Sequence, residues 1–351
     1  MKTQQIFFAG DHNPGMHPKV LASLGRVNGG KMSSYREDPE SQKMFENFNK
    51  LFGQKVKALN FSTGTAANIV GLSALVGPYQ SIICPATAHI NVYEAGALPR
   101  FAGCSLELIP TEDGKIKVSQ IEEILEKKPT GNLYPQAKVV YITQPTELGT
   151  LWTISELREI SAFCKKRGCY LFMDGARIAN AVQALNVSIK KMTVDVGVDV
   201  LTWGGIKNGG IADVLIFLNQ KPAKDVDFIY KQFGQEVAKS RFFAATINAL
   251  LQNNLWLKNA RIANEMAKRL YKKIAQNPKV QVVLPVQTNF VWSLISEKMN
   301  KKLSQKFMYY IEPNDITVAK FKEYPHFYRW VTSWATTEKE VDAFAEAINA
   351  L

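Results

Sequence analysis

The sequence of 351 residues is poor in the residues that build metal sites and disulfide frameworks. It contains four cysteines and four histidines, with no C-x-x-C pair and no His/Cys cluster at ligand spacing. These absences exclude a disulfide scaffold and give no support to a metal site. The cysteines lie beside apolar sequence, which favours reduced, buried thiols in a cytoplasmic protein. They are Cys84, Cys104, Cys164 and Cys169.

Long hydrophobic runs are also missing. The first apolar stretch ends before Asp11, too early for a signal peptide, and no later stretch approaches the ~20 apolar residues of a membrane span. We therefore expect a protein that is neither exported nor inserted in a membrane.

The chain carries a formal net charge of +12, from 43 Lys+Arg against 31 Asp+Glu. Its basic residues are spread in short groups, and none forms a run interleaved with aromatic residues. This distribution argues against a nucleic-acid partner and indicates an ordinary solvated surface.

Short apolar, β-branched runs alternate with helix-length segments between Lys57 and Leu218. Strands that are apolar almost throughout, joined by helices, predict an α/β domain with a mostly parallel sheet between two helical layers. From Glu236 to Gln276 one long helical pattern follows, and the remainder mixes strands and helices, with a final helix capped by Thr336 or Thr337. We predict a large domain over residues 1–245 and a smaller α+β domain over residues 246–351.

Three polar features follow predicted strands of the large domain. Gly64 and Thr65 lie in "NFSTGTAAN", where a strand runs into an Ala-rich helix whose free N–H groups suit a phosphate. Asp174 ends an apolar strand, and Lys207 follows another in "TWGGIKNGG". Each alone has a structural explanation, as a glycine turn, a helix cap or a flexible loop.

Together, and in this order, the three features satisfy what pyridoxal phosphate requires. Its phosphate needs an anchor, its aldehyde a lysine, and its pyridine nitrogen a carboxylate that keeps it protonated. A desolvated lysine at a strand end has the lowered pKa that forms an imine readily. The glycines around Lys207 are expected to let a flat ring approach the backbone. His89, after another strand, could stack on that ring.

At this point the sequence resembles the threonine aldolase branch of the β-eliminating lyases, pyridoxal-phosphate enzymes with the aspartate aminotransferase-like fold. The resemblance covers almost the whole chain and rests on "STGTAAN", "TAHINVYEAGA", "QPTELGT", "MDGARIANA" and "GGIKNGG". It is similar most of all to the low-specificity threonine and phenylserine aldolases.

The resemblance implies a role for each matching residue. Lys207 would hold the cofactor covalently, Asp174 would pair with the ring nitrogen, and His89 would stack on the ring. Arg177 and Arg329 would take the substrate carboxylate, with Asp11 in the same substrate site. The remaining cofactor and substrate contacts would be Gly64, Thr65, Arg177, Arg241 and Tyr35, with Tyr35 and Arg241 reaching the site of a neighbouring subunit.

Two positions depart from the family pattern, and the stretch "YRED" stands where the family commonly has "YGDD". Many threonine aldolases carry a histidine where this chain has Glu147, so the proton of the substrate hydroxyl could be taken by Glu147, by His89 or by a water. Gly10 replaces the usual serine before Asp11, which removes one carboxylate contact.

The predicted function is cleavage of a β-hydroxy-α-amino acid to glycine and an aldehyde. Threonine, allo-threonine and phenylserine-like compounds are the candidate substrates. The alternative is β-elimination or amino transfer on another amino acid. A non-catalytic regulator or anion-binding module is a third hypothesis, disfavoured because every expected catalytic position is present. The resemblance also implies a homodimer or homotetramer.

Overall fold

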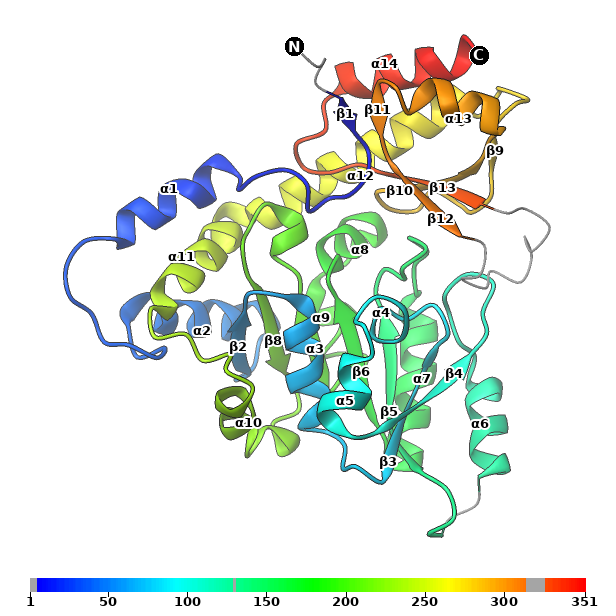
Figure 1. Cartoon of the computed structure of the whole chain (residues 1–351). Helices are drawn as coiled ribbons and strands as arrows, with labels where there is room; N and C mark the ends of the chain where they lie inside the picture. Colours follow the sequence, from blue (N-terminus) through cyan, green and yellow to red (C-terminus); the bar gives the residue numbers. More distant parts are fainter. Residues whose placement is uncertain (1–4, 129–130, 314–325) are drawn as a thin grey trace.

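The fold of this protein was analysed in a computed structural model, which describes residues 5–128, 131–313 and 326–351. Its main sheet has seven strands in the order β2-β8-β7-β6-β5-β3-β4, and only β8 runs antiparallel to its two neighbours. The strands are β2 (Lys57–Phe61), β3 (Gln80–Pro85), β4 (Ser105–Ile109), β5 (Gln136–Thr143), β6 (Tyr170–Gly175), β7 (Val200–Trp203) and β8 (Asp213–Phe217). All seven match predicted apolar runs, so the mostly parallel sheet is confirmed (Figure 1).

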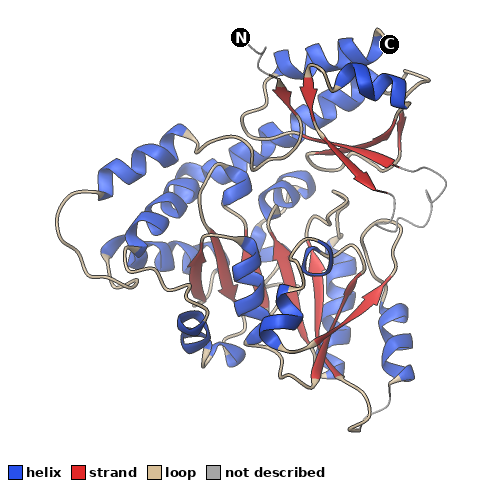
Figure 2. Ribbon diagram, viewed as in Figure 1, coloured by secondary structure: helices blue, strands red, loops and turns tan. Residues whose placement is uncertain are grey.

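Helices cover both faces of this sheet (Figure 2). Alternate residues of one strand enter different cores, because successive strand side chains point to opposite faces: Val140 and Ile142 belong to one cluster, Val139 and Tyr141 to the other. The first cluster packs against α1 (Pro18–Val27), α2 (Pro39–Phe52), α6 (Val118–Lys127), α7 (Ile154–Arg167), α8 (Ile178–Leu185) and α9 (Ile189–Met192). The second packs against α3 (Gly64–Ser73), α4 (His89–Val92), α5 (Ala97–Ala102) and α10 (Val226–Gln232).

Local sequence sets many of the helix ends. In α7, Thr153 and Glu156 form a reciprocal capping box, and Gly168 ends the helix with φ 68°. In α2, Asp38 accepts from the Ser41 amide ahead of the helix, and Gly53 ends it with φ 67°. These signals act within a few residues, so the local sequence is sufficient to set these helix ends.

The long helical pattern is two helices and not one, which corrects the prediction. Asn253 and Asn254 adopt left-handed φ angles of 52° and 55°, which separate α11 (Ser240–Leu251) from α12 (Leu255–Ile274) through the turn η3 (Gln252–Asn254). Asparagine tolerates this conformation because its short polar side chain bonds locally. The predicted domain boundary at residues 245 and 246 falls inside α11 and stays a prediction.

The C-terminal part is a small α+β unit. Its sheet has the order β12-β13-β10-β9 and is antiparallel throughout. Its elements are β9 (Gln281–Val282), β10 (Phe290–Leu294), α13 (Glu297–Leu303), β11 (Phe307–Met308), β12 (Tyr310–Pro313), β13 (His326–Val331) and α14 (Glu338–Asn349). Thr337 caps α14 in a capping box with Glu340, as one of the two predicted alternatives.

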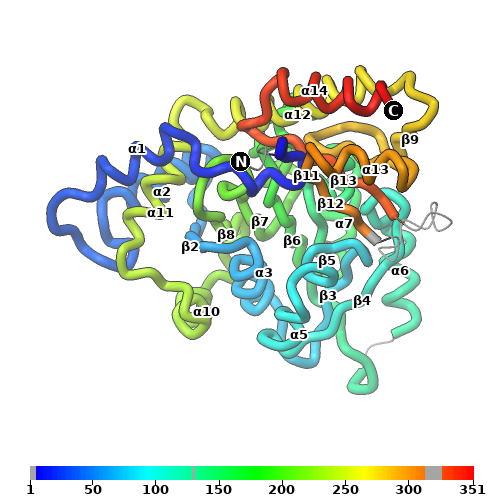
Figure 3. Tube along the Cα trace, turned by 45° about the horizontal axis from the view of Figure 1, so that its top comes forward, coloured from blue at the N-terminus to red at the C-terminus, as the bar shows by residue number. Residues whose placement is uncertain are grey.

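The start of the chain returns to this C-terminal unit. The N-terminal trace lies beside β11 (Figure 3), where strand β1 (Ile6–Phe7) pairs in parallel with β11. Phe8 stacks on Phe344 of α14. The segment that follows β1 therefore passes between the two parts of the molecule, which is how His12 reaches the cavity described below and Asp11 reaches Arg177.

All four cysteines are buried and unpaired. Among the residues with a described position, no helix combines the length and the apolar character needed to cross a bilayer.

Candidate active site

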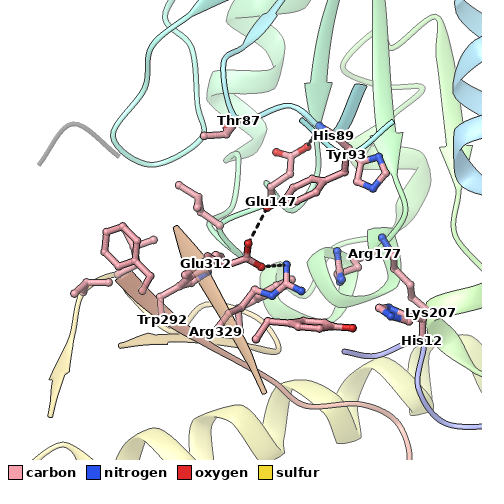
Figure 4. Close-up of a pocket in the computed structure, with 16 residues that line it drawn as sticks. His12, Thr87, His89, Tyr93, Glu147, Arg177, Lys207, Trp292, Glu312 and Arg329 are labelled. Carbon is pink, nitrogen blue, oxygen red and sulfur yellow. Dashed lines mark hydrogen bonds and ion pairs between the residues drawn. The ribbon is translucent and has the colours of Figure 1, made fainter. Parts of the chain in front are cut away.

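A cavity of about 400 Å³ lies between the carboxyl ends of the parallel strands and the small C-terminal sheet (Figure 4). Open α/β sheets bind ligands at this edge. Five of the predicted site residues line it together: His89, Glu147, Arg177, Lys207 and Arg329. Figure 4 shows Arg177, Lys207 and Arg329 close together on one side of the cavity.

Lys207 lies in the short turn η1 (Ile206–Asn208) directly after β7. Burial lowers the pKa of its ammonium group, and the nearby positive charge of Arg177 lowers it further. This amine is therefore prepared to act as a nucleophile nearer neutral pH than an exposed lysine.

Asp213 supports the lysine turn, and the sequence analysis missed it. Its carboxylate accepts from the backbone N–H groups of Gly205 (2.8 Å) and Ile206 (3.0 Å). A Cβ added at Gly64 would lie 3.1 Å from the other oxygen of this carboxylate. Asp213 thus joins the Lys207 turn to the N-terminus of α3, where the phosphate seat is predicted.

The glycines around Lys207 make room for the protein's own backbone. A Cβ at Gly204 would lie 2.0 Å from the carbonyl oxygen of Ala176, and one at Gly205 would lie 2.4 Å from that of Ala212. At these two positions the neighbouring backbone already requires glycine, and space for a flat ring stays a prediction.

Asp174 lies at the end of β6, buried behind the cavity. It accepts hydrogen bonds from Asn68 (3.0 Å), Tyr141 (2.7 Å) and the backbone of Ala176 (2.9 Å). Burial by itself would raise its pKa, but the charges of His89 and Lys207 and these hydrogen bonds outweigh it, so the pKa is lowered. Asp174 therefore stays ionised, as a partner for a protonated ring nitrogen must.

His89 begins the short helix α4 and is held by a second buried carboxylate. Its Nδ1 lies 2.8 Å from Glu94, whose side chain is fully buried. Asn68 donates to Glu94 as well as to Asp174, so one amide connects the partner of His89 with Asp174 itself.

Glu147 follows β5 and is enclosed by the protein. One of its oxygens accepts from the backbone N–H of His89 (2.9 Å) and from the hydroxyl of Thr143 (2.6 Å). Its other oxygen is buried without a partner among the described residues. Burial is the main reason that its pKa is raised above the usual glutamate value.

Both predicted carboxylate-binding arginines already contact acidic side chains. Arg177 grips Asp11 through Nε (2.5 Å) and Nη2 (2.9 Å), and Asp11 is buried. Burial by itself would raise the pKa of Asp11, but the charge and hydrogen bonds of Arg177, the charge of Lys207 and a hydrogen bond from Asn289 together lower it. Arg329 pairs with Glu312 at 3.0 Å. Asp11 thus contacts the site through Arg177.

Tyr35 and Arg241 lie outside this cavity. The segment that contains Tyr35 contacts the segment just before Arg241. The backbone of Tyr35 donates to Ala238, and that of Arg36 donates to Ser240 at the start of α11. The side chain of Tyr35 is 48 % exposed. Neither residue lines the cavity of its own chain.

Sequence reasoning missed the wall that the small sheet contributes. Alternate residues of its strands face the cavity: Phe290 and Trp292 from β10, Phe327 and Arg329 from β13, and Tyr310 and Glu312 from β12. These short strands show no clean alternation of apolar and polar residues, so the sequence carried little signal for this wall. His12 and Tyr93 were missed as well; at Gly10, a Cβ would lie 2.6 Å from the His12 ring, so glycine there leaves room for it.

The residues present fit pyridoxal phosphate. Lys207, a buried lysine of lowered pKa, lines the cavity, and the ionised Asp174 is buried behind it. Gly64 and Thr65 do not line the cavity; they begin helix α3, next to the Asp213 carboxylate. Among the described residues, the amides of Gly64 and Thr65 have no hydrogen-bond partner, while Thr63 caps the amide of Ala66. Two free N–H groups at the start of a ten-residue helix form a suitable seat for a phosphate.

Comparison with known proteins agrees with this geometry. Residues 15–298 match the family described as β-eliminating lyase. A low-specificity L-threonine aldolase of a Pseudomonas species is 35% identical over 356 residues, covering 100% of this chain and 99% of the relative. Another, from Pseudomonas aeruginosa, is 39% identical over 297 residues, covering 84% and 85%.

Solved structures show the same relationship. The structure of Leishmania major threonine aldolase is 29% identical, has a TM-score of 0.92 and covers 98% of this chain and 99% of that one. An aspartate aminotransferase from Thermotoga maritima, 15% identical with a TM-score of 0.73 over 99% and 92%, shares the fold. The predicted resemblance and fold class are confirmed.

Proposed function

This chain belongs to the β-eliminating lyase family, and from that premise we propose that it cleaves a β-hydroxy-α-amino acid to glycine and an aldehyde. Threonine, allo-threonine and phenylserine-like amino acids are the proposed substrates. The protein is a pyridoxal-phosphate-dependent lyase. The observation that carries the proposal is the cavity in which Lys207, with its lowered pKa, faces Arg177 and Arg329.

In this proposal, four parts of the large domain hold the cofactor. Lys207 would bind it covalently, Asp174 would pair with its ring nitrogen, and His89 would lie against the ring. The amides of Gly64 and Thr65 would take the phosphate. When bound, the cofactor supplies an electron sink for the bond broken at the substrate's Cα.

The two arginines would orient the substrate. A planar guanidinium holds a carboxylate in a fixed direction, and two of them on one side of the cavity fix the α-carboxylate relative to Lys207. Asp11 would position Arg177, because its bidentate contact prevents the arginine side chain from rotating.

We propose Glu147 as the group that takes the proton of the β-hydroxyl, directly or through one water. Support comes from its position in the cavity wall, its raised pKa and its buried oxygen without a partner among the described residues. A carboxylate whose pKa lies nearer neutral pH is a better base for this step. His89 is held by Glu94, which suits a ring-positioning role.

A homo-oligomer is proposed as the working form, with Tyr35 and Arg241 contributing to the site of a neighbouring subunit. Their adjacent positions outside their own cavity support this assignment. A cytoplasmic location is proposed from the four unpaired, buried cysteines, which suit a reducing compartment.

The test is a panel assay on purified protein loaded with pyridoxal phosphate. L-Threonine, L-allo-threonine and phenylserine are incubated separately, and glycine and aldehyde are quantified together. Equal amounts of the two products support the proposal. Release of ammonia and a keto acid without glycine would instead establish elimination, and conversion of the cofactor to its amino form would establish amino transfer.

A further inference from the structure

Arg329 is held from the neighbouring strand by an acidic residue inside the cavity. On β13, Arg329 lies directly opposite Trp292 of β10 and Tyr310 of β12. Its guanidinium lies 5.0 Å from the centre of the Tyr310 ring. Glu312, two residues further along β12 and on the same face, approaches Arg329 diagonally, and their Oε1 and Nη1 atoms are 3.0 Å apart.

Glu312 also connects the two sides of the cavity. Its second oxygen accepts from the hydroxyl of Tyr93, at 3.3 Å, and Tyr93 follows α4 in the large domain (Figure 4). Burial and the negative charge of Glu312 raise the pKa of Tyr93 to about 12, so Tyr93 remains a donor at neutral pH. Both oxygens of Glu312 are therefore occupied, and the carboxylate is only 12% exposed.

The exposed atoms of Arg329 determine what this pairing means for a ligand. Its Nε is buried without a partner among the described residues, so the cavity reaches the guanidinium through Nη1 and Nη2. A bidentate grip on a substrate carboxylate from the cavity needs both of these nitrogens, and Glu312 holds Nη1. The two carboxylates compete for one nitrogen and repel each other at short range.

We propose that Glu312 is an internal competitor for the substrate's α-carboxylate, and that it sets how tightly this site binds amino acids. Before the carboxylate of an amino acid makes a bidentate contact with Arg329, Glu312 must leave Nη1. This movement strains or breaks the hydrogen bond between Glu312 and Tyr93. The apparent affinity for any carboxylate ligand is then the intrinsic affinity multiplied by the fraction of molecules in which Arg329 is free of Glu312. The identity of the incoming carboxylate rests on the proposed function.

Glu312→Gln separates this effect from others because glutamine keeps the size and the acceptor for Tyr93 but loses the charge. The protein loaded with its cofactor is titrated by calorimetry with 3-phenylpropionate, a carboxylate without the reacting amine, and with 3-phenylpropan-1-ol, its uncharged counterpart. We expect about fivefold tighter binding of the carboxylate, as for release of one partly exposed ion pair, and unchanged binding of the alcohol. In the amino-acid assay, KM falls by a similar factor, while kcat changes less.

Two further variants check the interpretation. Tyr93→Phe removes the donor that holds Glu312, so carboxylate binding tightens in the same direction by a smaller factor. Asp342→Asn breaks the bidentate Arg269–Asp342 pair between α12 and α14, outside the cavity. It is the matched control for losing an arginine–carboxylate pair, and binding of both ligands stays unchanged.

Weaker or unchanged binding of 3-phenylpropionate to Glu312→Gln overturns the proposal, since Glu312 would then orient Arg329 or act elsewhere. Equal tightening for the acid and the alcohol also overturns it, because a wider cavity would explain both. The calorimetric measurement needs no turnover. A protein that releases no glycine but shows the carboxylate-specific shift would lose the proposed function and keep this inference.

Discussion

The phenol of Tyr141 donates a 2.7 Å hydrogen bond to the carboxylate of Asp174 inside the large domain. Both side chains are buried, and they extend from neighbouring parallel strands, β5 and β6. The proposed partner of the cofactor ring therefore depends on a tyrosine whose function no local motif indicates.

Tyr141→Phe is expected to weaken cofactor binding about tenfold, because a hydrogen bond to a charged group contributes about 1.5–3 kcal/mol and two other donors to Asp174 remain. Equilibrium titration with pyridoxal phosphate measures this change. Tyr170→Phe, at the opposite end of β6 from Asp174, is the control. Equal affinity in Tyr141→Phe and wild type would show that Tyr141 does not support this carboxylate.

Lys207→Ala is expected to abolish both aldolase activity and the visible absorption of the lysine-bound cofactor. Borohydride reduction followed by peptide mass spectrometry locates the attachment in the wild type. Lys191→Ala, an exposed lysine in α9, keeps both properties. Retention of the covalently bound cofactor by Lys207→Ala would refute the assignment.

Glu147→Gln is expected to lower kcat about 100-fold, within the range for loss of a general base. In the wild type, activity rises as Glu147 deprotonates, so the acidic limb of the pH profile lies above pH 4.5, the ordinary value for this group. This limb disappears in the variant. A wild-type limb that persists unchanged in Glu147→Gln assigns the proton transfer to another group.

The same raised pKa predicts how stability depends on pH. The folded state holds the proton of Glu147 more tightly than the unfolded state. The contribution of this proton to the free energy of unfolding is therefore fully present below the ordinary glutamate pKa. It is lost as pH rises through the raised pKa. Denaturant titrations across this pH window measure how the free energy of unfolding changes with pH. We expect a smaller change for Glu147→Gln than for wild type, and an identical change would contradict the raised pKa.

Gly204→Ala is expected to lower the free energy of unfolding by about 3 kcal/mol or more, since overpacking against backbone is not relieved by a rotamer change. The added Cβ would lie 2.0 Å from the Ala176 carbonyl oxygen. Gly29→Ala is the matched control, because its Cβ would have no heavy atom within 4 Å. Similar denaturation midpoints for the two variants would show that the Gly204 contact relaxes easily.

Subunit mixing tests the role proposed for Tyr35. Tyr35→Ala and Lys207→Ala are each expected to lose most activity. If Tyr35 acts in the neighbour's site, refolding the two variants together restores part of the activity through mixed oligomers with one intact site. No recovery in oligomers that are shown to be mixed would place Tyr35 outside the shared site.

The elements that the sequence predicts well are those governed by neighbours in the chain. The seven strands follow from apolar, β-branched runs, and the start of the last helix follows from the capping box of Thr337 and Glu340, three residues apart. The break between α11 and α12 was missed because Asn253 and Asn254 stand inside an uninterrupted helical period. An asparagine pair tolerates a left-handed turn but does not require one.

For the candidate site, the sequence alone determined the order of Gly64, His89, Asp174 and Lys207, and their positions after apolar strands. Parallel strands end at one edge of their sheet, so residues that follow them lie along that edge, and the strand order decides which of them come together. Only the tertiary structure decided that Tyr141 and Asn68 hold Asp174, and that Glu312 holds Arg329. Those contacts depend on strand register and on how the small sheet packs over the large one, and they join residues that no local pattern links.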